Sequence, residues 1–460
     1  MDNIQENKIG QDFTTIQLLG FSLPSFFMNC FTQLFKSLDD ALFISRYVGE
    51  KALAGLNLLN PLNCVQYALT HLFSLGSANI SAKLMGEHNQ DEAKQVFSKL
   101  FVSAIIYGIL FALICNIFSA PILRLLGADD SLFSFALIQI RYVYSITPIT
   151  LINSVFSSYY STAGKPKMGL ICSIVSGSTN ILLDIVLVSK MQMGVTGAAI
   201  ATAMGEIVVF FIGLFFFINK NHEIHFVKTK GEYINTCLAS FKYALPQFVN
   251  SVSIAVTSLI TNAILLDSMG SSGIAANAII SDIRSIITSG LIGIAVSISP
   301  VVAYNYGNRN PKKLKRILFS VLKIWFIGSL TLLIVGFILR KPLVSIFMSK
   351  DSTIEYYETA MFGLSIELFA VPFCAGCVTT SRVFIALSNT KVSTFISVFR
   401  NLVFKSICLI ILPMLLPKEG IWLAVPANEF LSFVMCVVFI YLNRNNYGYG
   451  KDEIASLMLD

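Results

Sequence analysis

The chain has 460 residues, of which 55% are apolar and only 13% are charged, and its mean hydropathy is +0.72. Soluble domains average about 45–50% apolar and about 25% charged residues, so this chain has too little charge to cover a surface that faces water. Its net charge of +7 comes from basic residues scattered through short connectors, without a basic stripe interleaved with aromatics. That distribution argues against nucleic acid as the partner.

Apolar runs of about 20 residues recur along the whole chain, separated by short polar connectors. A run of this length crosses a bilayer as a helix, because lipid offers no partner to unsatisfied backbone groups. The pattern predicts an all-α polytopic membrane protein with twelve transmembrane helices. The expected spans are 16–45, 52–80, 95–119, 132–160, 168–190, 194–219, 239–267, 274–304, 316–339, 354–385, 393–416 and 420–443.

Lysine and arginine are distributed unevenly between the two sets of connectors. If the N-terminus lies inside, the inner connectors hold KPK at 165–167, KKLKR at 312–316 and three lysines between 220 and 230, whereas the opposite connectors hold fewer basic residues. Positive residues favour the cytoplasmic side. We therefore expect a multi-pass protein of the cell inner (plasma) membrane with both termini in the cytoplasm, as an even number of spans requires.

The two halves of the chain resemble each other. GFSLPSF at 20–26 matches KYALPQF at 242–248, with the prolines offset by 246 − 24 = 222 residues. AKLMGEHNQDEAK at 82–94 matches AYNYGNRNPKKLK at 303–315, with the glycines offset by 307 − 86 = 221. Shared apolar composition alone does not explain Gly and Pro in register.

The repeat predicts the organisation of the chain. Six spans precede the second copy, an even number, so both copies insert the same way up as parallel repeats about an axis along the membrane normal. We expect an N-terminal six-helix lobe at 1–219, a cytoplasmic linker at 220–238, and a C-terminal six-helix lobe with a tail at 239–460. A central cleft is expected between the lobes.

Polar residues within the first six spans are candidates for function, since a charge inside a span costs roughly 2.5–3.5 kcal/mol on insertion scales. Asp39 and Asp40 lie in mid-segment, and Asn180 and Asp184 are separated by four residues, on one helix face about one turn apart. Thr202 follows a run of small residues where helices can approach closely. These oxygen ligands suit a hard cation or a shuttled proton. Polar cross-linking of helices is the competing interpretation.

Several of these segments together resemble the multidrug and toxic compound extrusion (MATE) transporters. They are LDDALFISRYVGEKALAGLNLLNPL, the GEHNQDEA loop, NILLDIVLV and GVTGAAIAT, and the resemblance covers nearly the whole chain. The resemblance implies a two-lobed transporter of twelve helices that exchanges an exported organic molecule for entering Na⁺ or H⁺.

The resemblance also implies roles for single residues. Asp40 matches the family's first-helix aspartate, whereas Asp39 replaces a residue that is usually apolar and is expected to flank the pathway. Asn180, Asp184 and Thr202 match the rest of a cation or proton site in the N-terminal lobe, so Na⁺ is expected at these residues together with Asp40. Asn153 matches a fourth-helix asparagine of the same site.

The second half departs from the family pattern. Some members carry acids in helices seven and ten, but the seventh span here has no acid before Asp267, and Asn262 stands at the repeat position of Asp40. Candidate pathway or substrate residues in this half are Asn262, Asp282, Arg284 and Glu367. Because residues 282 and 284 do not share a helix face, partners on other helices are expected for them, and the same holds for Arg382, Arg400, Lys405 and Glu429.

The sequence therefore predicts a secondary antiporter that exports small organic, cationic or amphipathic, drug-like molecules in exchange for Na⁺ or H⁺. The alternative is a lipid-linked oligosaccharide flippase of the same superfamily, although acids in the first half favour a cationic partner. Enzymatic activity is not expected, since Asp39 and Asp40 are followed by Ala-Leu-Phe and complete no DDxxD motif. No phosphate-binding GxxxxGK[ST] loop is present. We expect no cofactor beyond the coupling ion, a monomer in the bilayer and no nucleic-acid partner.

Overall fold

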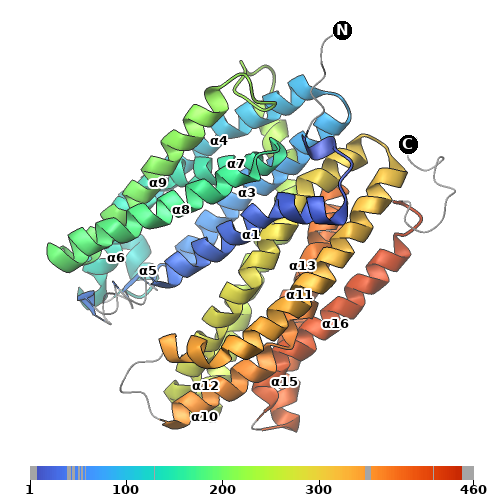
Figure 1. Ribbon diagram of the computed structural model, residues 1–460. Coiled ribbons are helices and arrows are strands. Elements are labelled where there is room, and N and C mark those ends of the chain that lie inside the picture. Colours follow the sequence, from blue (N-terminus) through green and yellow to red (C-terminus); the bar gives the residue numbers. More distant parts are fainter. Residues whose placement is uncertain are drawn as a thin grey trace. The chain divides into compact units, whose positions relative to one another are not determined.

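The computed structural model describes residues 8–38, 43, 47–49, 52, 55–56, 58–128, 130–347, 354–417 and 419–447. Within these ranges every regular element is a helix, so the predicted all-α class is confirmed. The chain is divided into two compact units, a first unit of Met1–Gln11 and Phe27–Ala244 and a second unit of Asp12–Phe26 and Leu245–Asp460. Figure 1 shows the helices coloured along the chain.

The first unit is built from a series of helices joined by short turns. Helix α1 (Thr15–Leu38) contributes residues to both units. The elements that follow in the first unit are α3 (Asn60–Gly86), α4 (Gln90–Ile117), α5 (Ser119–Leu125), α6 (Asp130–Tyr142), η3 (Tyr144–Ile146), α7 (Thr147–Thr162), α8 (Pro166–Asp184), η4 (Ile185–Lys190) and α9 (Gly194–Ile218).

The larger segment of the second unit, Leu245–Asp460, begins within a long helix. Its elements are α10 (Tyr233–Gly307), α11 (Pro311–Phe347), α12 (Ile354–Glu367), α13 (Ala370–Ala386), α14 (Thr390–Val398), η5 (Phe399–Val403), α15 (Phe404–Leu415) and α16 (Gly420–Leu442). Helix α10 starts at Tyr233, twelve residues before this segment.

Helix α10 doubles back on itself. A straight helix of 75 residues would be about 110 Å long, several times the thickness of a bilayer. Gln247 and Thr288 would be about 60 Å apart along such a rod, yet both line one cavity. Near the middle, a Cβ at Gly273 would lie 3.5 Å from Leu265 and 2.5 Å from Met269, which shows how tightly the chain bends there. The helix therefore supplies two spans, Tyr233–Met269 and Ala276–Gly307.

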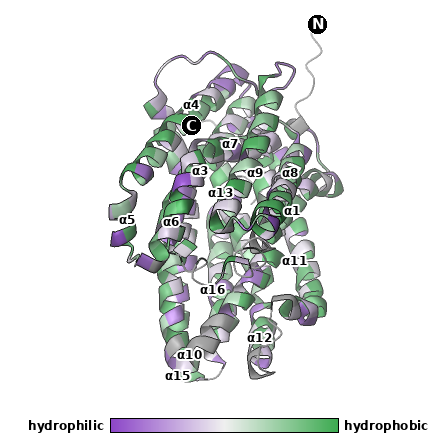
Figure 2. Ribbon diagram, turned by 90° about the vertical axis from the view of Figure 1, so that its left-hand side faces the viewer, coloured by the Kyte–Doolittle hydropathy of each residue, from purple (hydrophilic) through white to green (hydrophobic). Residues whose placement is uncertain are grey.

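The described residues contain ten helices long and apolar enough to cross a membrane, or eleven if the pair Tyr357–Glu367 and Ala370–Ala386, bent by 48°, forms one span. The remaining expected span corresponds to α3, whose 27 residues are long enough, at about 40 Å, but not apolar enough to be counted with the others. The predicted number of twelve is therefore not confirmed. Figure 2 shows hydrophobic residues predominating along most of the helices.

The turn between α7 and α8 shows why helices end where they do. Gly164 has a φ of 68°, a left-handed conformation that ends α7. The N–H of Lys165 donates to the carbonyl of Tyr160, and Pro166 then starts α8. Ser388, 224 residues later, has a φ of 62° at the end of α13, and the N–H of Asn389 donates to Phe384 in the same way. The sequence repeat therefore recurs in the backbone.

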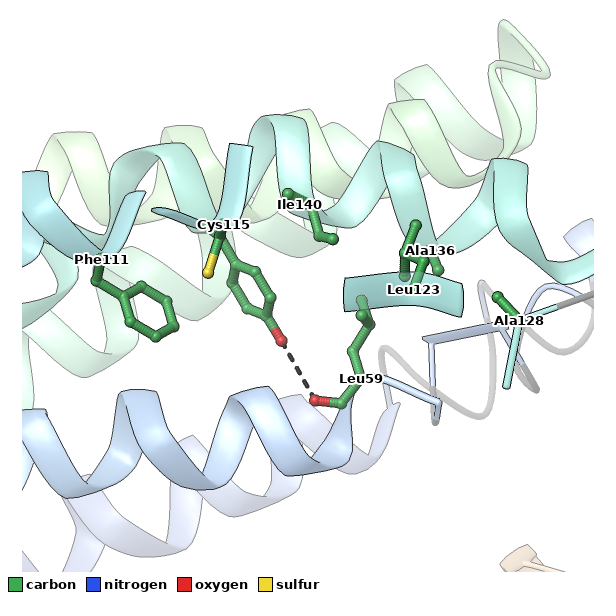
Figure 3. Packing of buried hydrophobic residues seen from close by; sticks show 8 residues of the cluster. Leu59, Phe111, Cys115, Leu123, Ala128, Ala136 and Ile140 are labelled. Carbon is green, nitrogen blue, oxygen red and sulfur yellow. Dashed lines mark hydrogen bonds between the residues drawn. The ribbon is translucent and has the colours of Figure 1, made fainter. Parts of the chain in front are cut away.

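One hydrophobic cluster of the first unit joins α3, α4, α5 and α6 (Figure 3). Its fully buried members include Leu59, Leu123 and Ile140. The hydroxyl of Tyr144 lies 3.4 Å from the carbonyl oxygen of Leu59, the contact drawn in Figure 3, and donates to Asn63 at 2.7 Å. A buried phenol needs such a partner, so this bond fixes the start of α3 against η3.

The connector between α9 and α10 is held against the first unit. Residues 219–232 contain no helix, but their backbone N–H groups find side-chain acceptors: Val227 donates to Ser98 at 3.0 Å, and Lys230 donates to Gln95 at 2.9 Å. Phe226 packs at 5.0 Å against the ring of Phe97. The last residues of the predicted linker, 233–238, are already part of α10.

Candidate functional site

Three of the predicted coupling residues lie on the adjacent helices α8 and α9. The amide nitrogen of Asn180 donates to the hydroxyl of Thr202 at 3.3 Å, and Asp184, one turn beyond Asn180, is fully buried. Asp184 is the last residue of α8 before the π-helical turn η4. Such π turns often occur at functional sites.

Small residues allow this close approach of α8 and α9. A Cβ at Gly205 would lie 3.0 Å from the carbonyl oxygen of Ser176, and one at Gly197 would lie 3.1 Å from the backbone of Leu187. Because the two backbones pass so near each other, a short side chain such as Thr202 can reach the amide of Asn180. The run of small residues noted in the sequence is therefore the physical cause of the contact.

The predicted partners from the first span, Asp39 and Asp40, lie outside the described residues. The pairing of Asp40 with Asp184 therefore stays a prediction, and so does a Na⁺ site that uses both carboxylates. Among the described residues there is no group of three or more His, Cys, Asp or Glu that could hold a metal ion.

Asn153 contacts an acid that the sequence analysis did not single out. Its amide nitrogen donates to the backbone oxygen of Glu206 at 2.9 Å and to the carboxylate of the same residue at 2.5 Å. Asn153 is on α7 and Glu206 on α9, where the glutamate is the one charged side chain among 25 residues. This isolation of a single acid in an apolar run was the signal that could have identified it.

Glu206 extends the polar site. Thr202 and Glu206 are four residues apart on α9, as Asn180 and Asp184 are on α8, and residues at this spacing share a helix face. A continuous polar band, defined here as Asn153, Glu206, Thr202, Asn180 and Asp184, thus crosses from α7 through α9 to α8. It brings two acids and two amides into an otherwise apolar part of the first unit.

The second unit contains a cavity of about 440 Å³ that lies among α10, α12, α13, α14, η5, α15 and α16. This volume is within the range of small-molecule sites. Of the predicted pathway residues, Arg284 and Glu367 line the cavity, whereas Asn262 and Asp282 are exposed and do not. The charged residues of the wall are Arg284, Glu367, Arg382, Arg400, Lys405 and Glu429.

Two ion pairs join different helices across this wall. The Nε atom of Arg284 lies 3.0 Å from Oε2 of Glu367, and the guanidinium of Arg400 donates two bonds of 2.8 Å to the carboxylate of Glu429. The side chain of Glu367 is 2% exposed and that of Glu429 is 6% exposed. The expectation that these residues have partners on other helices is met in both cases.

The sequence profile of the MatE family matches residues 24–186 and 246–410. The chain belongs to the MatE family. The two matched segments begin 246 − 24 = 222 residues apart, which is the offset found between the two halves of the sequence. The family resemblance seen in the sequence is therefore confirmed.

Curated relatives and solved structures cover nearly the whole chain. The multidrug export protein MepA of Staphylococcus aureus is 21% identical over 439 residues, 95% of this chain and 96% of that protein. The probable multidrug resistance protein YoeA of Bacillus subtilis is 21% identical over 425 residues, 90% of each. An outward-facing structure of a multidrug resistance MATE family transporter has a TM-score of 0.89 at 17% identity, covering 96% of this chain and 98% of that one.

A structure of another MOP superfamily transporter, from Pyrococcus furiosus, has a TM-score of 0.86 at 18% identity over 96% of this chain and 98% of that chain. That transporter is described as having a binding pocket of reversed polarity. At 17% and 18% sequence identity, these similarities establish the fold of the chain. The charge of its cavity depends on its own residues.

Proposed function

We propose that this member of the MatE family is a secondary antiporter that exports small organic, cationic or amphipathic molecules in exchange for Na⁺ or H⁺. The relatives MepA and YoeA are named for multidrug export and resistance, which supports organic molecules as the exported class. They give no support to the alternative of a lipid-linked oligosaccharide flippase. We place the protein in the cell inner membrane with both termini cytoplasmic.

The observation that carries the proposal is the complete burial of Asp184 on a membrane-spanning helix, one turn from Asn180 and within the polar band. An ionisable residue at membrane depth is costly, and it usually marks an ion or proton path. The amide nitrogen of Asn180 is engaged by Thr202, so its carbonyl oxygen is available to a cation. Oxygen atoms of this kind are the ligands of Na⁺-like hard cations and of protons.

The same residues suggest how ion entry drives export. In the proposed site, the carboxylates of Asp184 and Asp40 repel each other unless a cation or a proton is present. Binding of the ion removes the repulsion, so it favours one conformation of the helices over another. An electrical gradient supplies about 2.3 kcal/mol per charge per 100 mV. That is enough for roughly fifty-fold accumulation of the exported molecule.

The test is transport in proteoliposomes. Purified protein is reconstituted, and a Na⁺ gradient and a pH gradient are imposed separately while movement of a fluorescent organic cation and a fluorescent amphipathic dye is followed. We expect movement with at least one gradient and none with ATP alone. Sustained transport with ATP after ionophores have collapsed all gradients would refute the proposal.

A further inference from the structure

The cavity of the second unit carries an excess of positive charge. Its wall contains four basic residues and two acids, so the described residues give a net charge of 4 − 2 = +2. Arg284 and Arg400 are each paired with a glutamate, as described above. The excess therefore resides in Arg382 and Lys405.

Arg382 is buried and incompletely satisfied. Its side chain is on α13, the residue is 8% exposed, and its Nη1 atom has no hydrogen-bond partner among the described residues. Its Nη2 atom makes a long bond of 3.4 Å to the amide oxygen of Gln247. A guanidinium has five donors in a planar fork suited to carboxylate and phosphate. A buried donor without a partner indicates a missing acceptor.

Lys405 supplies the second charge from α15 on the same wall. No carboxylate among the described residues lies within ion-pair distance of its ammonium group: the two glutamates of the cavity are 3.0 Å and 2.8 Å from Arg284 and Arg400 instead. A net positive charge in a buried cavity is unfavourable unless an anion offsets it.

The rest of the wall shows what kind of anion fits. Apolar side chains line the cavity between the charged groups, among them Ile254, Ile292, Val378, Ile396 and Val425. Hydroxyl and amide groups from α10, such as Ser281 and Asn250, add further polar contacts. A cavity of about 440 Å³ with mixed lining is suited to an organic molecule rather than to a bare inorganic ion.

We infer that this cavity binds a small amphipathic organic anion, whose carboxylate or phosphate is attracted by the excess positive charge of Arg382 and Lys405 and whose apolar part lies against the aliphatic wall. The inference deepens the proposed transport function, because it names the chemical class of ligand that the second unit takes. It does not depend on that function for its test, since binding can be measured without a gradient.

The probe is bromo-octanoate, and the protein is the full chain in phosphatidylcholine nanodiscs. The chain has only two tryptophans, and Trp422 directly follows Ile421, a residue of the cavity wall. A bromine atom in the cavity therefore quenches tryptophan fluorescence, and saturation gives the Kd. We expect saturable quenching by bromo-octanoate and none by bromo-octyl trimethylammonium at the same concentrations.

Variants test whether the side chains of Arg382 and Lys405 bind the anion. Arg382→Gln and Lys405→Gln should each raise the Kd about tenfold, the loss expected for one charge-assisted contact. Lys323→Gln removes the same charge from an exposed position of α11 outside the cavity and should leave the Kd unchanged. Arg382→Lys keeps the charge, so it should bind within a few fold of wild type even if the neutral variant does not fold.

Two further binding experiments identify which kind of anion occupies the cavity. At high ionic strength, where the surface potential of an anionic lipid is screened, phosphatidylglycerol in the nanodisc should not raise the Kd of the probe. If it does, a lipid headgroup occupies the cavity and the inference of a soluble ligand is wrong. Inorganic phosphate should compete only weakly, and competition equal to that of octanoate would refute the role of the apolar wall. Equal binding of the cationic probe, or wild-type Kd values in both neutral variants, would overturn the inference as a whole. Saturable binding without gradient-driven export would refute the proposed function alone.

Discussion

Arg400 and Glu429 meet side by side in the second unit: Nε and Nη2 of the guanidinium each donate a bond of 2.8 Å to one carboxylate oxygen. The side chains are 14% and 6% exposed, so water does little to stabilise either charge. The same Nη2 also lies 3.1 Å from the sulfur of Cys374. This pair joins η5 to α16 and forms part of the cavity wall.

Removing one member of this pair should destabilise the protein strongly. Glu429→Gln leaves Arg400 charged and buried, a situation that typically costs about 3–5 kcal/mol. The double variant Arg400→Gln with Glu429→Gln should recover part of that loss. Thermal unfolding in detergent measures both effects. Glu87→Gln serves as the control, since its pair with Lys83 is about one-third exposed and should contribute less than about 1 kcal/mol. Equal losses for the two glutamate variants would contradict the expectation.

Glu206 should be required for coupled transport. Glu206→Gln removes one of the two acids of the polar band and should reduce gradient-driven export at least about tenfold, a loss of about 1.4 kcal/mol in the driving interaction. Asn153→Ala should reduce it less, because it removes a neutral donor to the carboxylate. Export is measured per amount of protein in the membrane. Glu92→Gln, at an exposed position of the first turn of α4, is the matched control. An equal loss of export in this variant would show that Glu206 has no specific role in coupling.

Asp184 and Asp40 should act together. Asp184→Asn or Asp40→Asn is expected to abolish export driven by a gradient while leaving expression largely intact, since each removes a charge that the coupling ion neutralises. Asn180→Ala should weaken coupling less, and Asp39→Asn should be milder still, because adjacent helical residues point about 100° apart. The measurement is export by each variant under an imposed Na⁺ or pH gradient. Wild-type rates for both Asp184→Asn and Asp40→Asn would show that the site is assigned wrongly.

Gly108 permits the contact between α4 and α7. A Cβ at this position would lie 2.5 Å from the Cα of Pro148 and 2.8 Å from its nitrogen, and backbone atoms cannot move aside as a side chain can. Gly108→Ala should therefore lower stability by about 1–3 kcal/mol, measured by thermal unfolding. Gly20→Ala is the control, because nothing lies within 4 Å of the added methyl, and alanine favours a helix. A neutral Gly108→Ala variant would mean that the two helices separate easily.

His222 should make the connector 219–232 sensitive to pH. Partial burial, followed by the nearby charges of Lys165 and His225, lowers the pKa of its imidazole below the ordinary value of 6.5. The unfolded connector then binds the proton more readily than the folded one. The stabilisation is complete above about pH 6.5 and is lost as the pH falls through the lowered pKa of the folded state.

Amide hydrogen exchange of residues 219–232 should therefore speed up as the pH falls below about 6.5, after correction for intrinsic rates. His222→Phe keeps a ring on Phe216, with which the imidazole stacks at 4.0 Å, and removes the titrating group. The pH dependence should disappear in this variant and persist in His88→Gln, which changes an exposed histidine elsewhere. Persistence of the effect in His222→Phe would show that another group is responsible.

Much of the fold followed from local properties of the chain. The transfer of each apolar run into lipid is favourable by itself. The spans and the all-α class could therefore be predicted without knowing which other helices each run contacts. The face shared by Asn180 and Asp184 followed from helix geometry alone. Length did not decide the number of spans, because α3 is long enough but polar, and α10 continues through two spans that the sequence suggested were separate helices.

The contacts between helices were decided by the tertiary structure. Small residues such as Gly205 bring α9 against α8, and that approach places Thr202 on Asn180. The packing of α9 on α7 places Glu206 beside Asn153. In the second unit the sequence identified the six charged side chains that line the cavity, but not which of them neutralise each other. Pairing depends on which helix faces meet, a property of packing rather than of any one segment. That packing joins Arg284 to Glu367 and Arg400 to Glu429, and it leaves Arg382 and Lys405 as the positive charge of a cavity.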